Sequence, residues 1–165
     1  DMYQALLYLM RDKAFSSISV SDITSEAGVS RMAFYRNYSK IEDILTEHLD
    51  EVVEKYKDRE LQENKAEREK IFYEKKYMIN CFRFFYDHHE FIDALIAAGM
   101  GDLFLAKITE YLIRKWIEPG TETREVILRI SAYAGSIYNM YRVWSRDRFL
   151  EEPEEVAEIL YNFRK

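Results

Sequence analysis

The sequence is poor in cysteine, proline and glycine, and each shortage excludes a class of structure. Its 165 residues include one cysteine, Cys81, two prolines and five glycines. A lone cysteine cannot form an internal disulfide and is typical of proteins in a reducing compartment. Few prolines and glycines leave few places where a helix must break. We therefore expect a chain built mainly of helices.

Long apolar segments are also missing. No stretch approaches the about 18 apolar residues that a membrane-spanning helix needs, and no signal-peptide pattern is visible. Hydrophobic residues make up 48% and charged residues 33% of the chain, as in an ordinary globular protein. A length of 165 residues suits one compact unit or two small helical domains. These features predict a cytoplasmic, all-α protein.

Motifs for catalysis and metal binding are not found either. The sequence has no Gly-rich phosphate loop, no G-x-S-x-G motif and no pattern of paired catalytic carboxylates. His88, His89 and Glu90 are adjacent, and neighbouring helical residues point about 100° apart, so we interpret them as a helix end. Cys81 lies on an apolar stripe and is interpreted as a small core residue. We predict no enzymatic activity, no metal and no cofactor.

The most informative stretch runs from Ser19 to Lys40 and predicts two short helices that meet at a tight turn. Ser19 is followed three residues later by Asp22, the capping-box pattern of a helix start. The first helix should run from about Val20 to Ala27. Gly28 then ends it, because glycine adopts the left-handed conformation without steric cost. The residues expected to be buried on this helix are Val20, Ile23 and Ala27.

The second short helix should follow at once, from about Arg31 to Tyr38. Ser30 caps it, and we expect Val29 to fill the space between the two helices. Phe34 should face the core. This arrangement predicts a helix-turn-helix, whose second helix enters the DNA major groove with its N-terminal residues leading.

The remaining helices are predicted from apolar periodicity. Ser39, with Glu42 three residues later, should cap a long helix from Ile41 to Tyr56. Lys57 to Lys70 is a mixed charge run, which is typical of a solvated segment. Gly99 to Gly101 predicts a hinge. The further helices are expected at 71–88, at 91–98, from 102, where Asp102 would be the cap, to 116, from Thr121 or Thr123 to 146, and from Pro153 onward.

Several of these residues together resemble the DNA-binding domain of TetR-type transcriptional regulators. The residues that carry the resemblance are Ala5, Leu9, Phe15, Ser19 to Ile23, Ala27 to Ser30, Phe34, Tyr35, Tyr38, Ser39 and Lys40. Ala14, Thr24 and Tyr38 depart from the family, which usually has Gly, Ala and Phe there. The resemblance implies a three-helix DNA-binding domain at 1–48 and a helical effector-binding and dimerisation domain at 49–165.

The start of the second short helix is where we expect contacts to bases. Arg31 could bind guanine O6 and N7 with two hydrogen bonds, a contact that contributes about 1–3 kcal/mol of discrimination. Arg31 could instead contact phosphate or solvent. Met32 and Ala33 could touch a thymine methyl group or only fill the groove. Ser30 lies at the same end of the helix.

Phosphate contacts are expected beside these. Tyr35, Asn37 and Lys40 match positions where the family contacts phosphate, and Ser19 and Ser21 could offer hydroxyl and backbone N–H groups. Capping alone would also explain Ser19. Arg36 is expected to point outward and is a further candidate for a DNA contact. The formal net charge of the chain is −6, but the segment from Arg11 to Lys40 contains five basic residues and three acidic ones. So few cations predict a shallow salt dependence of DNA binding.

The last two helices are predicted to form a homodimer interface. The resemblance implies a four-helix bundle made by two copies, and small residues near Gly135 would allow close approach of another helix. The predicted interface residues are Ile130, Ala134, Ile137, Tyr141, Trp144, Val156, Ile159, Leu160 and Phe163.

The resemblance also implies a small effector of unknown identity, held in a cavity of the C-terminal domain. The predicted lining residues are Tyr77, Cys81, Phe85, Met100, Phe104, Tyr133 and Tyr141. Alternatively, these side chains simply pack against one another. The function implied is a regulator, by family a repressor, that binds a palindromic operator in double-stranded DNA. Two alternatives are a protein-interaction adaptor that no longer reads DNA and a small helical enzyme, for which we find no polar site.

Overall fold

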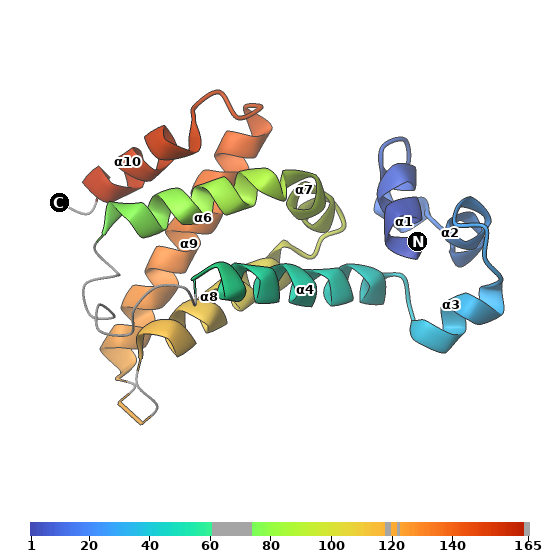
Figure 1. Cartoon of the computed structure of the whole chain (residues 1–165), viewed down its shortest axis with the longest axis horizontal. Helices are drawn as coiled ribbons and strands as arrows, with labels where there is room; N and C mark the ends of the chain where they lie inside the picture. Colours follow the sequence, from blue (N-terminus) through green and yellow to red (C-terminus); the bar gives the residue numbers. More distant parts are fainter. Residues whose placement is uncertain (61–73, 118–119, 122, 164–165) are drawn as a thin grey trace. The chain divides into compact units, whose positions relative to one another are not determined.

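The protein is all-α, as predicted. The computed structural model describes residues 1–60, 74–117, 120–121 and 123–163, and every secondary-structure element in these ranges is helical (Figure 1). Most of the predicted charge run 57–70 lies outside the described residues. The chain divides into two compact units, residues 1–61 with 90–101 and residues 62–89 with 102–165. The boundary predicted at residue 48 stays a prediction; a single helix, α4 (Glu42–Glu60), runs across it.

The first unit holds the N-terminal helices and one later helix. Its elements are α1 (Met2–Met10), the 3₁₀ turn η1 (Phe15–Ser17), α2 (Val20–Glu26), α3 (Arg31–Asn37), α4 and nearly all of α7 (His89–Ala97). Each of the first helices contributes a side chain that is 0% exposed: Leu6, Ile23, Phe34 and, from α4, Leu45. Burial of each such side chain stabilises the fold by about 1.5–3 kcal/mol. The four helices therefore share one core.

Three aromatic rings attach α7 to this core. The ring of Tyr3 on α1 stacks on His48 of α4 with 3.8 Å between centroids, and Phe91 of α7 meets His48 edge-on at 4.6 Å. Burial, together with the charges of Glu90 and Glu51, raises the pKa of Tyr3 to about 12. Residues 90–101 thus belong structurally with the N-terminal helices, although they lie far from them in sequence.

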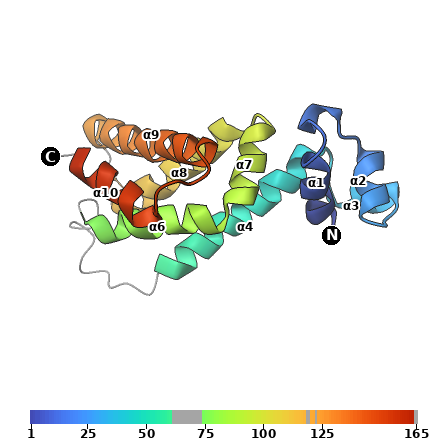
Figure 2. The same ribbon diagram turned by 90° about the horizontal axis from the view of Figure 1, so that it is seen from above.

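The second unit contains α6 (Lys75–Asp87), nearly all of α8 (Gly101–Trp116), α9 (Arg124–Arg146) and α10 (Pro153–Phe163). Helices α6 and α10 lie side by side in both views (Figures 1 and 2). Ion pairs from Lys75 to Glu158 and from Arg83 to Glu154 join them. The backbone N–H of Glu154 and the Arg83 guanidinium lower the pKa of the Glu154 carboxyl.

A cluster of aromatic rings closes this unit near the α9–α10 connection. The ring of Phe149 meets that of Trp144 edge-on at 4.9 Å, and the Trp144 indole N–H donates to the backbone oxygen of Glu151 at 2.9 Å. Arg148 and Phe149 both have positive φ, 59° and 55°. The backbone N–H groups of Arg148 and Phe149 donate to the Ser145 and Trp144 oxygens, so the last turn of α9 is closed without a glycine.

Some helix starts differ from the sequence prediction. Helix α4 begins at Glu42, so the residue that reaches back is Asp43, not Glu42. The Asp43 carboxylate accepts the backbone N–H groups of Ser39 at 2.8 Å and Lys40 at 3.0 Å. Asp102 lies inside the first turn of α8, which already includes Gly101. Of the two threonines considered for α9, Thr123 is the cap, and its hydroxyl accepts the Val126 N–H at 3.3 Å.

Candidate DNA interface

The turn between α2 and α3 is held by backbone hydrogen bonds and one glycine. Gly28 has φ +65°, and a Cβ at this position would meet nothing within 4 Å. Glycine is therefore required by backbone conformation, not by crowding. The N–H of Val29 donates to the Thr24 oxygen at 2.9 Å and that of Gly28 to the Ser25 oxygen at 3.3 Å, the Schellman pattern. Val29 itself is 39% exposed, so the expectation that it fills the gap between the helices was wrong.

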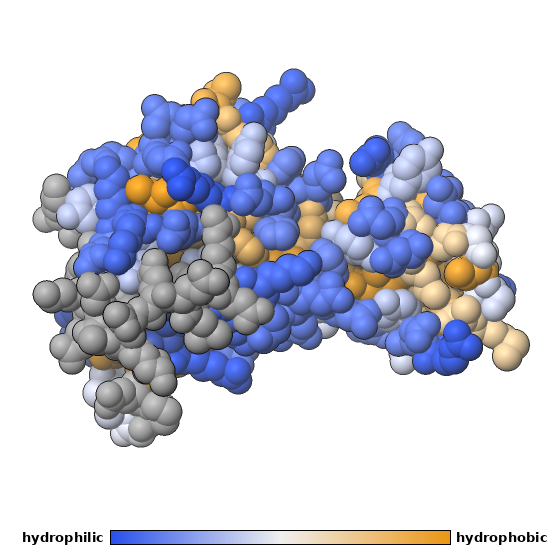
Figure 3. All heavy atoms as spheres, viewed as in Figure 1, coloured by the Kyte–Doolittle hydropathy of each residue, from blue (hydrophilic) through white to orange (hydrophobic). Residues whose placement is uncertain are grey.

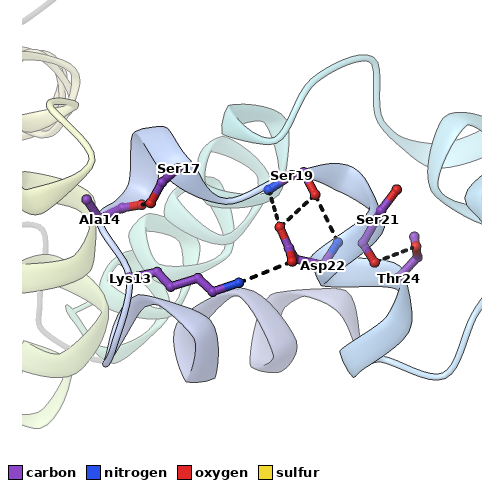
Figure 4. A network of polar contacts seen from close by, with 7 residues as sticks. All are labelled: Lys13, Ala14, Ser17, Ser19, Ser21, Asp22 and Thr24. Atoms are coloured by element: carbon purple, nitrogen blue, oxygen red, sulfur yellow. Dashed lines mark hydrogen bonds and ion pairs between the residues drawn. The ribbon is translucent and has the colours of Figure 1, made fainter.

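The start of α2 is fixed by a carboxylate (Figure 4). The Ser19 hydroxyl accepts the Asp22 backbone N–H at 3.1 Å and the Ser19 backbone N–H donates to Asp22 Oδ2 at 2.8 Å, which completes the predicted capping box. The Ser19 hydroxyl also donates to Asp22 Oδ2, at 2.6 Å. Lys13 Nζ lies 3.2 Å from Asp22 Oδ1. The hydrogen bonds from Ser19, followed by that from Lys13, lower the pKa of Asp22 to about 2. The Ser19 hydroxyl thus already donates its proton within the protein. Ser21, like Ser19, is exposed.

Helix α3 presents one face to the core and the other to solvent. The Ser30 hydroxyl caps it by accepting the Ala33 N–H at 3.1 Å, and Phe34 is 0% exposed. On the outer face Met32 is 84% and Tyr35 is 55% exposed. Figure 3 shows apolar and pale side chains among the surface atoms at this end of the first unit. Of the ten predicted DNA contacts, Ala33 is half-buried and the other nine are exposed. The exposed residues are Ser19, Ser21, Ser30, Arg31, Met32, Tyr35, Arg36, Asn37 and Lys40.

Two polar groups at the end of α3 already have partners inside the protein. The Asn37 amide donates to the Ala33 oxygen at 2.9 Å, which turns this side chain back along its own helix. Tyr38 follows α3, and its hydroxyl donates to Glu47 Oε2 on α4 at 2.5 Å. The sequence alone does not indicate that Glu47 is the partner of the Tyr38 hydroxyl. Periodicity along one helix carries no signal for a partner on another.

Comparison with known families identifies the arrangement of α2, α3 and the turn between them. Residues 4–47 match the family model described as "Bacterial regulatory proteins, tetR family". Residues 4–47 therefore form an N-terminal helix-turn-helix domain of the TetR family. The matched TetR-family segment contains most of α1, all of α2 and α3 and the first turns of α4, and thus all ten predicted DNA contacts. Comparison with curated proteins and with solved structures gave no significant match.

The aromatic residues predicted to line an effector cavity in this TetR-family protein are mostly buried. Phe85 packs against Phe104 and Tyr141 at ring distances of 5.4 and 5.6 Å, in the second unit. Tyr77 and Tyr133 are buried in the same unit, and Cys81 is half-buried there. Met100 belongs to the first unit. An open groove of about 360 Å³ also lies in the first unit, lined by Tyr8 and Arg11 of α1, Glu26 of α2, Glu90 and their neighbours. The effector cavity stays a prediction.

The residues predicted to form the dimer interface divide into two sets. Seven are buried within the chain itself: Ile130, Ala134, Ile137, Tyr141, Trp144, Val156 and Leu160. Ile159 and Phe163 are exposed by 57% and 84%. The outer surface of α9 carries different residues, namely Leu128, Ser131, Ala132, Asn139 and Val143, all exposed.

Both histidines of the pair contact neighbouring residues in the described structure, and Cys81 is a half-buried free cysteine. His88 packs on the ring of Phe84 at 4.3 Å, and His89 Nδ1 lies 2.7 Å from the Tyr86 oxygen. Within the described ranges no three His, Cys, Asp or Glu side chains group as metal ligands. The helices that the structure describes include none long and apolar enough to cross a membrane.

Proposed function

We propose that this TetR-family protein is a cytoplasmic repressor that binds a palindromic operator as a homodimer and responds to a small effector. The observation that carries the proposal is the division of α3 into two faces. Phe34 is 0% exposed and anchors the helix, while Met32 and Tyr35 on the outer face are 84% and 55% exposed. Contact of these large side chains with water is unfavourable in free energy. Contact with a DNA groove would replace that water and remove the unfavourable term.

The exposed residues suggest how the contacts divide. Arg31 and Met32, at the start of α3, would face base edges, where a two-bonded arginine–guanine contact contributes about 1–3 kcal/mol of discrimination. Tyr35 and Lys40 would bind phosphates and set the register of the helix in the groove. Ser19 and Asn37 are expected to contribute less than Ser21, because their polar groups are already bonded within the protein.

For the homodimer, we propose that the contact is made by the outer surface of α9 with Ile159 and Phe163 of α10. Gly135 would lie at its centre, because a Cβ there would meet nothing within 4 Å of its own chain, so a helix of the partner could approach closely. The predicted residues that the chain already buries would support this surface from behind. Binding to a palindromic operator would require the α3 helices of the two copies to lie about one helical turn of DNA apart.

The dimer proposal is tested by Gly135→Arg, measured by analytical ultracentrifugation. The added side chain should convert the dimer to monomers, whereas Glu110→Arg, at an exposed position on α8, should leave it intact. A dimer that survives Gly135→Arg would place the interface elsewhere.

DNA binding is tested by selecting duplexes from a random pool at low salt. We expect an enriched palindrome. Tyr35→Phe and Lys40→Ala should weaken binding to every sequence, whereas Arg31→Ala should relax the preference at particular base pairs. A pool with no enrichment would favour the adaptor alternative. An enriched operator that all three variants bind like the parent would mean that the contact surface is elsewhere.

The effector part of the proposal needs a separate measurement. A ligand can shift the protein between DNA-binding and released states only by its difference in affinity for them. We expect a metabolite that stabilises the full chain in a thermal-shift screen to weaken operator binding. Ligands that stabilise the protein equally with and without DNA would contradict this.

A further inference from the structure

Tyr38 lies where α3 ends, and it contacts two other parts of the first unit. Its backbone is extended, with φ −133° and ψ 142°, and its N–H donates to the Phe34 oxygen at 2.9 Å. Its ring lies 5.6 Å from the buried ring of Phe34. Its hydroxyl donates to Glu47 Oε2, on the second turn of α4, at 2.5 Å. One side chain thus joins the recognition helix to the long helix that follows.

Helix α3 needs such a connection because it is short. Seven residues make two turns, and a helix of that length has little stability of its own. Phe34 anchors its middle, but one buried ring leaves the helix free to tilt about that point. Since the three residues from Phe34 to Arg31 span about 4.5 Å, a tilt of about 10° would move the end that carries Arg31 by about 0.8 Å. A second attachment, at Tyr38, restricts this tilt.

The chemistry of the contact makes it stronger than an average hydrogen bond. Burial, the hydrogen bond to Glu47 and the negative charges of Glu47 and Glu51 raise the pKa of Tyr38 to about 12. The hydroxyl therefore keeps its proton at neutral pH and donates to an ionised carboxylate. Such charge-assisted bonds are roughly twice as strong as neutral ones.

We propose that the Tyr38–Glu47 hydrogen bond sets the orientation of α3 and thereby sharpens the base preference of this domain. Tyr38 is a positioning residue: it acts on DNA through the placement of Arg31 and Met32. The specificity part of the inference rests on the proposed DNA-binding function, whereas the orientation part does not. The family usually has phenylalanine at this position, so Tyr38→Phe keeps the ring and removes a single oxygen.

The test compares Tyr38→Phe, Glu47→Ala and Glu47→Gln with the double variant Tyr38→Phe/Glu47→Ala, all in the full chain. Two quantities are measured: amide hydrogen exchange at residues 34–38, and the ratio of affinities for the selected operator and an unrelated duplex. The ratio is used because removal of the Glu47 charge should raise affinity for all DNA alike. Tyr38→Phe and Glu47→Ala should each speed exchange and lower the ratio about three- to tenfold, which is less than the full strength of a charge-assisted bond because only part of it is expressed as base preference. Glu47→Gln keeps a neutral acceptor oxygen, so its exchange rate and its affinity ratio should lie between those of the parent and those of Glu47→Ala.

The results of these measurements test the orientation part and the specificity part of the inference separately. Unchanged exchange in Tyr38→Phe would overturn the inference, because α3 would then be held without the bond. Faster exchange with an unchanged ratio would overturn the specificity part. In the Tyr38→Phe background, Glu47→Ala should have no further effect on the ratio; an additional loss would show that the two residues do not act as a pair. If the parent prefers no duplex at all, the proposed function and the specificity part both fail, and the exchange data still decide whether the bond holds α3.

Discussion

Replacement of Gly28 should separate the cost of backbone conformation from the cost of crowding. The residue has φ +65°, and an added Cβ would meet no atom within 4 Å. Gly28→Ala therefore introduces no clash, and its cost is the left-handed conformation of a non-glycine residue, about 1–2 kcal/mol. Alanine also reduces the entropy of the unfolded chain, which returns about 0.4–1 kcal/mol. The net loss of unfolding free energy should be about 0.8 kcal/mol, between limits of about 0 and 1.6 kcal/mol.

Gly28→Asn is the matched variant, because asparagine tolerates the left-handed conformation better than alanine does. Both variants are compared with the parent by urea denaturation followed by far-UV circular dichroism, with equal m-values as the condition for comparison. We expect the order parent, Asn, Ala in decreasing stability. Equal losses for Asn and Ala would refute the reasoning, because the cost would then not depend on the left-handed conformation. A loss well above 2 kcal/mol for either variant would also refute it, because a loss of that size requires a steric clash.

Two further predictions concern stability at other sites. Arg148 adopts φ 59° without being glycine, so Arg148→Gly should raise the unfolding free energy by about 0.5–1 kcal/mol, whereas Arg148→Ala, which keeps the strain, should not; equal midpoints for the two in urea would contradict this. The pKa of Asp22 is lowered to about 2, so the ionised carboxylate contributes stability that is complete above about pH 4, the range of an unfolded aspartate, and is lost as pH falls through 2. Asp22→Asn should therefore flatten the fall of the thermal midpoint between pH 4 and 2, and an unchanged pH profile would argue against the capping contacts.

The helix-turn-helix could be predicted from the sequence because its determinants are local. Ser19 with Asp22, Gly28, and Ser30 each act on residues within a few positions, and the structure has the corresponding caps and turn. The apolar periodicity of the later helices was equally informative about where they lie. Their ends were less certain, as Asp43 shows, because a cap depends on which residue begins the helix.

What the sequence could not provide is the direction in which an amphipathic helix points when both of its sides are suitable. Helix α9 carries apolar residues on both sides, with Ile130 and Ile137 on one and Leu128 and Val143 among small residues on the other. The chain turns Ile130 and Ile137 inward, which leaves Ala132 and Val143 exposed. That choice depends on the volume available between α6, α8 and α10. The Tyr38–Glu47 bond was hidden for a similar reason, since it joins residues of different helices.

The contact of Phe91 with Tyr3 and His48 limits how the DNA-reading module can be transplanted. A fragment cut after the family-matched segment, at residue 47, would lose His48 and Phe91 and leave Tyr3 without its stack. Newly bared rings of this kind promote aggregation. A chimaeric regulator that contains this N-terminal helix-turn-helix domain should therefore also include residues 90–101, or have Tyr3 replaced with a polar residue.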